Sequence, residues 1–262
     1  MAAKAGRIDG VALGVKVGTY WPGNAAEGLP AHASTVLLLD GATGIPIAIV
    51  GASHLTALRT AAADAVAVDA LARPDATALA LVGAGHQAFH DAVAIARVRT
   101  PTSVAVWGRR PDQVVAMVVR LLDAGLPARP ADLEEAVSGA DIVCTVTSSH
   151  EPLIRVEWVQ PGTHISAMGA DAAGKQELEV GLIRAARCVV DVAAQAVTIG
   201  ELQHAAAAGV LDVASLVSLG DVLAGREQGR RSADEITVFD SSGTAVQDLA
   251  VCELARRALE RR

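Results

Sequence analysis

A glycine-rich turn between a buried strand and a helix is the feature that most constrains the fold of this chain. The apolar run Ala78–Val82 is followed by Gly83-Ala84-Gly85-His86-Gln87-Ala88, and residues 87–97 have a helical pattern. The first glycine of such a turn permits a tight bend, the second lets the backbone approach a phosphate, and a small third residue allows close helix–strand packing. The helix start also offers free N–H groups and a positive dipole end to an anion. The segment predicts a dinucleotide site; the alternative is a plain strand-to-helix turn.

Strand-like and helical runs alternate through the middle of the chain. Such alternation is typical of an α/β fold, a parallel sheet whose strands are joined by right-handed helical crossovers. The predicted strands are Ala78–Val82, Ser103–Trp107 and residues 141–146, 164–168 and 188–192, and the predicted helices are residues 87–97, 111–124, 132–138 and 176–186.

The segments on either side of this region do not show the regular alternation of strands and helices. Three strands without intervening helices precede the alternating region, and the turn at residues 41–44 joins two of them in a hairpin. This first segment is therefore expected to belong to a separate domain. The predicted elements outside the alternating region are strands at 14–20, 35–40, 45–50 and 236–239 and helices at 55–72, 200–208, 216–223 and 246–257.

Composition and charge exclude several classes of partner. The net charge is −7 and the basic residues form no block, so nucleic acid is not expected. No apolar run is long enough to span a bilayer, and residues 1–10 lack the apolar core of a signal peptide. Cys144, Cys188 and Cys252 are scattered and odd in number, which suits a reducing cytoplasm and a packing role.

The end of the second strand of a dinucleotide domain usually decides between NAD and NADP. An acidic residue there binds the ribose 2′-hydroxyl, whereas an arginine accepts a 2′-phosphate. This chain has Gly108-Arg109-Arg110 at that place and no acidic residue, which favours NADP(H), with NAD(H) as the other possibility. The alternative is that both arginines are solvated residues at the start of the next helix.

A set of further motifs resembles the ornithine cyclodeaminase/mu-crystallin family, in family order from Gly14 to the C-terminus. Its members include cyclodeaminases, ketimine reductases, alanine-type amino acid dehydrogenases and a hormone-binding crystallin. The matching words are residues 14–24 (GVKVGTYWPGN), 55–63 (LTALRTAAA), 83–88 (GAGHQA), 139–143 (GADIV) with Thr145 and Thr147, 161–171 (PGTHISAMGAD), Gly200-Glu201, and 239–243 (FDSSG) with Gln247-Asp248.

The resemblance implies a domain organisation. It is a Rossmann-type doubly wound parallel sheet inserted into a smaller α+β dimerisation and substrate domain. On this basis residues 59–235 form the NAD(P)-binding domain with its connecting helices. Residues 1–58 and about 236–262 form the smaller domain.

The resemblance also assigns roles to individual residues. Lys16 and Arg59 match the ligands of the substrate carboxylate, and Lys16 is counted with the acid/base Asp171 as catalytic. His32 has a less secure alignment than the other cofactor contacts. The expected cofactor-binding residues are His32, Thr60, Gly83, Ala84, Gly85, His86, Gln87, Arg109, Arg110, Thr145, Thr147, Met168, Lys175 and Ser241.

The chemistry of these residues agrees with those roles but leaves alternatives open. Lys16 and Arg59 are cations within apolar segments, so each is expected to pair with an anion, either a substrate carboxylate or an internal salt-bridge partner. The other alternative is that the side chain snorkels to the solvent. Asp171 follows a strand at the edge where open parallel sheets bind ligands, and could move a proton or cap the predicted helix 176–186. Thr145 and Thr147 could contact a cofactor or simply favour strands.

No metal site is expected. His86 and His90 are four residues apart on one helix face, but no acidic partner or HExxH pattern accompanies them. Packing or phosphate contact is therefore expected of His86.

The N-terminus departs from the family pattern. Family members carry a segment upstream of residues 14–24 that contributes sheet and a further substrate-binding arginine, and Arg7 does not lie in that motif. We expect weaker substrate binding, and an exposed sheet edge that is covered in a homodimer.

The sequence thus predicts an NAD(P)H-dependent oxidoreductase or deaminase acting at the α-carbon of a small amino or imino acid. Cyclodeamination uses hydride transfer twice with no net redox change, and reduction of a cyclic ketimine uses it once. The alternatives are a catalytically weak NADPH-binding protein of the mu-crystallin type and an alanine dehydrogenase-like enzyme.

Overall fold

The computed structural model describes residues 1–261, apart from the side chains of residues 22 and 25. The chain forms two compact units, and each is described by itself. The smaller unit consists of Met1–Thr60 and the segment from Gly243 onward, and the larger unit is Ala61–Ser242. Among the described residues, no helix combines the length and the apolar character needed to cross a membrane.

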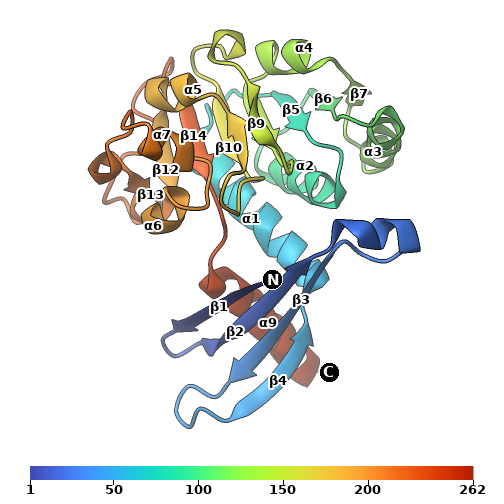
Figure 1. Cartoon of the computed structure of the whole chain (residues 1–262), viewed down its shortest axis with the longest axis vertical. Coiled ribbons are helices and arrows are strands. Elements are labelled where there is room, and N and C mark those ends of the chain that lie inside the picture. Colours follow the sequence, from blue (N-terminus) through green and yellow to red (C-terminus); the bar gives the residue numbers. More distant parts are fainter. Residues whose placement is uncertain (262) are drawn as a thin grey trace. The chain divides into compact units, whose positions relative to one another are not determined.

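The larger unit is built on an eight-stranded sheet in the order β13-β12-β14-β10-β8-β5-β6-β7 (Figure 1). Every neighbouring pair in this sheet is parallel, which confirms the predicted Rossmann-type α/β fold. Its strands are β5 (Ala78–Val82), β6 (Ser103–Trp107), β7 (Ala128–Pro130), β8 (Ile142–Thr145), β10 (His164–Ala167), β12 (Arg187–Val190), β13 (Val217–Ser218) and β14 (Thr237–Asp240). A separate two-stranded sheet pairs β9 (His150–Ile154) with β11 (Gln176–Leu178).

Helices cover both faces of the larger sheet. Alternate residues of one strand enter two different cores: Leu79 and Leu81 pack in one, and Ala80 and Val82 in the other. Strands buried on both faces explain the nearly continuous apolar runs in the sequence. The helices are α1 (Ser53–Leu71), α2 (His86–Val98), α3 (Pro111–Asp123), α4 (Leu133–Ser138), α5 (Val180–Ala185), α6 (Ala193–Ala196), α7 (Gln203–Ala207) and α8 (Leu219–Leu223), with short 3-10 turns at Val156–Trp158 and Val213–Ser215.

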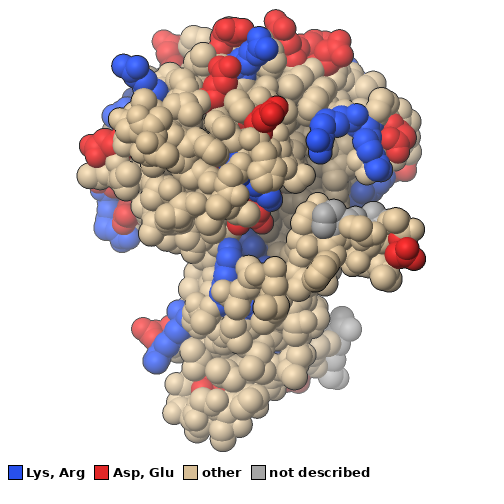
Figure 2. Space-filling model, viewed as in Figure 1, with Lys and Arg blue, Asp and Glu red and all other residues tan. Residues whose placement is uncertain are grey.

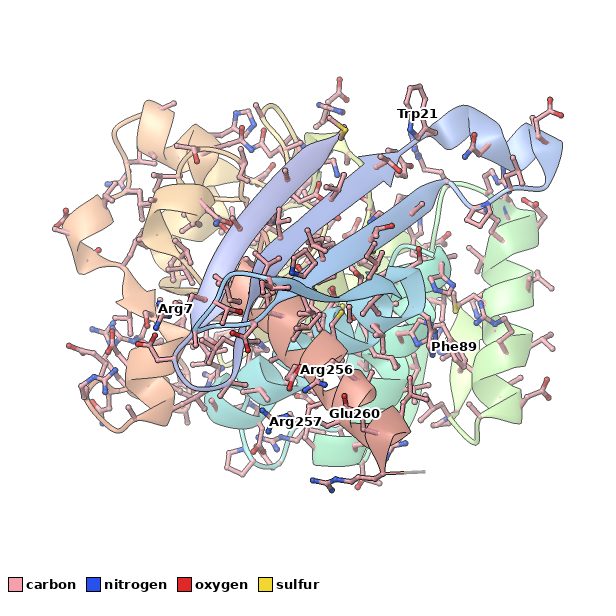
Figure 3. The ribbon with its side chains drawn as sticks, turned by 90° about the horizontal axis from the view of Figure 1, so that it is seen from below. Arg7, Trp21, Phe89, Arg256, Arg257 and Glu260 are labelled. Atoms are coloured by element: carbon pink, nitrogen blue, oxygen red, sulfur yellow. The ribbon has the colours of Figure 1, made fainter. Side chains whose placement is uncertain are left out.

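The smaller unit is an antiparallel sheet in the order β1-β2-β3-β4, packed on the last helix (Figures 1 and 3). Glycines allow the close approach, because a Cβ at Gly6 would meet the Cβ of Ala245 at 2.8 Å. Val36, Leu38 and Leu249 form the centre of its small core. The elements are β1 (Ala2–Ile8), β2 (Ala12–Tyr20), β3 (His32–Leu39), β4 (Pro46–Gly51), a 3-10 turn (Pro22–Glu27) and α9 (Ala245–Glu260).

The structure corrects three expectations. The strand predicted at 236–239 lies inside the larger sheet, between β12 and β10, so the boundary placed near residue 236 comes one strand too early. The helix predicted over 176–186 is the strand β11 followed by α5, because Glu201 binds the backbone N–H groups of Glu177 and Leu178. Strand β1 was not predicted, since its alternation of small and polar residues has little apolar signal.

Candidate active site

The glycine turn after β5 has the geometry of a close-approach loop. Gly83 has φ +124°, and a Cβ there would meet the carbonyl oxygen of Val146 at 2.8 Å, so only glycine fits. Gly85 is the N-cap of α2, where a Cβ would meet nothing within 4 Å. Ala88 is fully buried, as expected for close packing of helix on strand. The open Gly85 and the uncapped start of α2 therefore form a cradle that fits a pyrophosphate.

The next residues of the loop contact one another along α2. Gln87 donates from Nε2 to Oδ1 of Asp91 at 2.7 Å. The rings of His86 and His90 meet edge to face with centroids 4.7 Å apart. Their contact is a packing contact, and contact of His86 or Gln87 with a cofactor stays a prediction.

One buried cluster among the described residues has metal-ligand spacing, and it is not the histidine pair. The ligand atoms of Asp64, Asp91 and Cys144 all lie within 4.8 Å of one another. The Cys144 thiol donates to Oδ2 of Asp64 at 3.3 Å, and burial raises the pKa of Asp64 to about 6. Burial also raises the pKa of the Cys144 thiol, so this thiol keeps its proton.

Two exposed arginines follow β6, at the place predicted to choose the cofactor. Arg110 is 3.7 Å from Asp112, a loose surface pair. Arg109 is exposed, and no ion pair joins it to another residue of the described chain. Both guanidinium groups are accessible to an anion, and their contact with a 2′-phosphate stays a prediction.

Glu177 joins the carboxyl ends of β8 and β10. Its Oε2 accepts hydrogen bonds from the Thr145 hydroxyl at 2.8 Å and from the Gly169 N–H at 3.0 Å, and its Oε1 accepts from the Thr147 N–H at 2.6 Å. A Cβ at Gly169 would meet this carboxylate at 2.5 Å, so glycine makes the contact possible. Thr145 is fully buried and its hydroxyl is used by Glu177, so its side chain has no accessible surface for the direct cofactor contact expected of it.

The loop after β10 carries Asp171, and several contacts hold it. Lys175 donates from Nζ to Oδ1 of Asp171 at 2.5 Å and to the Gly169 carbonyl at 3.1 Å. Gln203 accepts from the Gly174 N–H at 2.7 Å and donates to the carbonyl of Ala172. The Asp171 side chain is 59% exposed, and no helix follows it directly, so the helix-cap alternative is wrong.

The other predicted residues of this edge directly follow the strands β10 and β14. Met168 is buried and its N–H donates to the Thr145 carbonyl at 2.8 Å. Ser241 is also buried and donates from its hydroxyl to Oδ2 of Asp191 at 3.0 Å. The structure thus brings the ends of β8, β10, β12 and β14 together at one edge, as parallel strands require.

Besides Glu177, two further buried carboxyl groups of this edge were not predicted as site residues. Glu201 accepts from the backbone N–H groups of Glu177 and Leu178. Asp240 accepts from the Leu202 N–H at 3.2 Å, and burial raises its pKa to about 8. Burial also raises the pKa of Glu177 and that of Glu201. The Gly200-Glu201 and 239–243 motifs contained these residues, but nothing local indicated what they bind.

In the smaller unit, Lys16 and Arg59 converge on one carboxylate. The Lys16 Nζ and the Arg59 Nε each donate to Oδ1 of Asp248, both at 2.9 Å, and Arg59 also donates to Gln247 at 3.0 Å. Lys16 is 7% exposed, and burial, with the positive charge of Arg59 as the next cause, lowers its pKa. The internal salt bridge, left open as an alternative, is therefore present. Whether a substrate carboxylate joins it stays a prediction.

His32 and Thr60 also belong to this unit. His32 is exposed at the start of β3, and its Nε2 is 4.0 Å from the position of a Cβ on Gly18. The Thr60 hydroxyl donates to the Thr56 carbonyl at 2.8 Å. Neither contact tests the cofactor role expected of these residues.

A hollow of about 410 Å³ lies elsewhere on the smaller unit and is not lined by any predicted site residue. Its lining includes Arg7, Glu253, Arg256 and Arg257, and three of these carry labels in Figure 3. The two α9 arginines bind Glu253 and lower its pKa to about 2. The charges of this hollow are thus already paired.

Comparison with known proteins identifies the family. Residues 1–261 match the ornithine cyclodeaminase/mu-crystallin family. The chain belongs to this family. It is 44% identical over 241 residues to the iminosuccinate reductase of Paracoccus denitrificans, covering 92% of this chain and 75% of that one. It is 32% identical over 243 residues to the ketimine reductase mu-crystallin of Mus musculus, with 93% and 75% coverage.

Solved structures of the family have the same fold. An archaeal alanine dehydrogenase dimer with bound NAD has a TM-score of 0.94 at 38% identity, covering 99% of this chain and 81% of that one. The predicted family and fold are thus confirmed. The family's reductases and cyclodeaminases also bear out the predicted activity class, an NAD(P)H-dependent oxidoreductase or deaminase of small amino or imino acids.

Proposed function

We propose that this family member reduces an imino acid at its α-carbon, with NADPH preferred over NADH. The observation that carries the proposal is the open cradle at Gly85 in the same unit as the Lys175-held Asp171. A bound nicotinamide cofactor supplies the hydride. Lys16 and Arg59 are the proposed ligands of the substrate carboxylate.

Asp171 performs the proton transfer in this proposal. Its carboxyl group gives a proton to the imine nitrogen as the carbon becomes tetrahedral, and takes one in the reverse direction. Lys175, whose Nζ lies 2.5 Å from Oδ1 of Asp171, orients the carboxylate. A cyclodeaminase would use the same group twice on one substrate, so the substrate set decides between the two reactions.

The test is a nicotinamide oxidation assay with three substrate sets: 2-oxo acids plus ammonia, cyclic imines, and diamino acids. We expect Asp171→Asn to lose about 10²–10⁴-fold in turnover while cofactor affinity is kept, since an amide cannot exchange the proton. Asp132→Asn, at an exposed aspartate before α4 that makes no capping bond, is the matched control. Cofactor binding without turnover on any set would instead support the mu-crystallin-like alternative.

The cofactor preference is assigned to Arg109 and Arg110. Several solved relatives contain NAD+ or NADH, so the proposed preference for NADPH rests on the two arginines after β6 alone and not on these relatives. Exchanging both for alanine is expected to weaken NADPH binding by about 1.5–3 kcal/mol per lost contact and to leave NADH nearly unchanged. Arg226→Ala, at an exposed arginine paired with Asp221, is the control. Equal affinities of the unmodified protein for both cofactors would contradict the assignment.

We also propose a homodimer in the cytoplasm. Ile45, Ile47 and Ile49 at and beside strand β4 are 62%, 47% and 78% exposed, and an edge strand of this kind seeks a partner. An archaeal alanine dehydrogenase of the same fold is described as a dimer. All three cysteines are free, which suits a reducing compartment. Light scattering of the protein and of Ile49→Lys tests the assembly, and a stable, active monomer would contradict it.

A further inference from the structure

The side chain of Gln203 binds the Asp171 loop, which is the segment between β10 and β11. Gln203 is the first residue of α7. Its Oε1 accepts from the Gly174 N–H at 2.7 Å. Its Nε2 donates to the Ala172 carbonyl at 3.3 Å and to the Lys175 carbonyl at 3.1 Å. One amide group thus binds three backbone groups of this loop.

The middle of the loop depends on hydrogen bonds, because its side chains cannot pack. Ala172, Ala173 and Gly174 are exposed, and Gly174 has φ +81°. A stretch of such small, exposed side chains buries little apolar surface, so hydrogen bonds to its backbone determine its conformation. Gln203 makes three of these bonds, and the His150 ring makes a further contact, since its Nδ1 is 2.9 Å from the Gly174 carbonyl oxygen.

Gln203 is itself fixed to the large sheet. Its Nε2 also donates to the Gly200 carbonyl at 2.8 Å. The N–H of the adjacent Leu202 donates to the buried Asp240 of β14 at 3.2 Å, and a Cβ on Gly200 would meet this carboxylate at 2.5 Å. Gln203 therefore ties the loop to β14, which is the neighbour of β10 in the sheet.

The backbone that Gln203 binds also carries the Asp171–Lys175 ion pair. Asp171 directly precedes Ala172, and the Nζ of Lys175 lies 2.5 Å from Oδ1 of Asp171. The Asp171 side chain is 59% exposed, so packing does not hold it and its position follows the backbone. A group that transfers a proton must lie within hydrogen-bond reach of the reacting atom, and a misplacement of about 1 Å can cost about 10²-fold in rate.

We propose that Gln203 is a positioning residue for the proton transfer. It holds the backbone from Ala172 to Lys175, so that the carboxylate of Asp171 keeps its place relative to the sheet. The inference rests on the proposed role of Asp171 and adds a residue that no sequence motif singled out. Gln203 acts through Asp171 and is not itself a catalytic residue.

Gln203→Met tests this role, because it keeps the length of the side chain and removes its hydrogen bonds. These bonds are exposed or half-buried, so water can replace them and the midpoint of urea denaturation should change little. The turnover number is expected to fall by about 10- to 100-fold, while KM and the Kd of the cofactor change by less than about 2-fold. Gln160→Met, at an exposed glutamine that donates to the Trp158 carbonyl at 3.4 Å, is the control and should change none of these quantities.

A double-mutant cycle with Asp171→Asn shows whether Gln203 acts through Asp171. Because the asparagine has already lost the proton transfer, adding Gln203→Met to it is expected to lower the residual turnover number by less than about 2-fold. The same fall in both backgrounds would show that Gln203 acts independently of Asp171, and would overturn the inference.

Limited proteolysis measures the loop without reference to activity. Trypsin cleaves after Lys175, and cleavage of the native protein requires the loop to open. We expect Gln203→Met to be cut at this bond about 10-fold faster than the unmodified protein, as followed by mass spectrometry, and Gln160→Met to be cut at the unmodified rate. An unchanged cleavage rate in Gln203→Met would overturn the inference.

The outcomes separate this inference from the proposed function. Full turnover in Gln203→Met would overturn the positioning role while the proton transfer by Asp171 stands. Full turnover in Asp171→Asn, or no turnover of any substrate set by the unmodified protein, would overturn the proposed function and the positioning role together.

Discussion

Buried charged groups have different kinds of partner in the two units of this protein. In the smaller unit, Lys16, Arg59 and Asp248 satisfy one another as side chains of opposite sign. In the larger unit, Glu177, Glu201 and Asp240 gather at one sheet edge, and in the described residues none of them forms an ion pair. Backbone N–H groups bind these carboxyl groups instead. The visible surface of the larger unit shows acidic and basic residues interspersed (Figure 2).

This difference in partners agrees with the proposal that the buried charges bind a ligand in the smaller unit, and it indicates that they hold the backbone in place in the larger unit. Lys16 and Arg59 share the single carboxylate of Asp248, and a substrate carboxylate is the further anion proposed to join them. Carboxyl groups held by backbone donors make a frame, because each one fixes two segments that are distant in sequence. Glu177 ties the end of β8 to Gly169 at the start of the Asp171 loop, and Glu201 ties β11 to the segment before α7.

The largest expected effect tests the pairing in the smaller unit. Asp248→Asn removes the carboxylate shared by Lys16 and Arg59, which are nearly buried. Because it leaves two cations unpaired, we expect a loss of about 3–5 kcal/mol in the free energy of unfolding, measured by urea denaturation. Asp9→Asn, at an exposed surface pair, is the control and should be silent.

The same variant sharpens the comparison through ligand binding. If a substrate carboxylate joins the cluster, L-alanine should stabilise Asp248→Asn more than it stabilises the unmodified protein. Equal stabilisation of the variant and the unmodified protein would show that the cluster is a structural ion pair that binds no ligand.

The next effect tests the frame in the larger unit. Glu177→Gln places an amide N–H₂ against the N–H of Thr147 or Gly169, so one buried donor loses its acceptor. We expect a loss of about 1–3 kcal/mol in the free energy of unfolding. The turnover number should fall more than the cofactor affinity, since the Asp171 loop loses its anchor. Glu151→Gln, at an exposed position, is the control, and an unchanged turnover number would reduce Glu177 to a purely structural residue.

The smallest expected effect concerns how the free energy of unfolding changes with pH. Two buried groups of the larger unit, Asp240 and His164, change it in opposite directions. Burial raises the pKa of Asp240 to about 8, so the folded state holds its proton longer than the unfolded state, and stability is lost as pH rises from 3.8 towards 8. Burial lowers the pKa of His164 to about 3, so the unfolded state takes up a proton first, and stability is lost as pH falls below 6.5.

The two slopes oppose each other over the acidic range and can be separated by mutation. Relative to the unmodified protein, Asp240→Asn should make stability rise more steeply with pH, by at most about 1.4 kcal/mol per pH unit. His164→Gln should shift the slope in the opposite direction by a similar amount. Denaturation midpoints between roughly pH 5 and pH 7 provide the measurement, and parallel slopes in all three proteins would contradict the assignment.

Much of this protein follows from the sequence alone. The βα unit around Gly83 and Gly85, the parallel sheet and the family could be predicted because each rests on local signals: apolar runs, glycines at fixed spacing, and motifs read in order. The roles proposed for Lys16, Arg59 and Asp171 came from the resemblance of their motifs to the family, and their place in or after apolar segments agreed with those roles without deciding them.

The partners of those residues required the tertiary structure. Lys16 meets Asp248 across 232 positions of sequence, and Lys4 meets Gly243 across 239. Strand β11 was mistaken for a helix because Glu201, 23 positions beyond Leu178, binds its backbone, and β14 was placed in the wrong unit because strand pairing is a long-range choice. Sequence determines which groups a chain carries and the local backbone they favour, whereas only folding decides which charges meet, because that depends on contacts between distant segments.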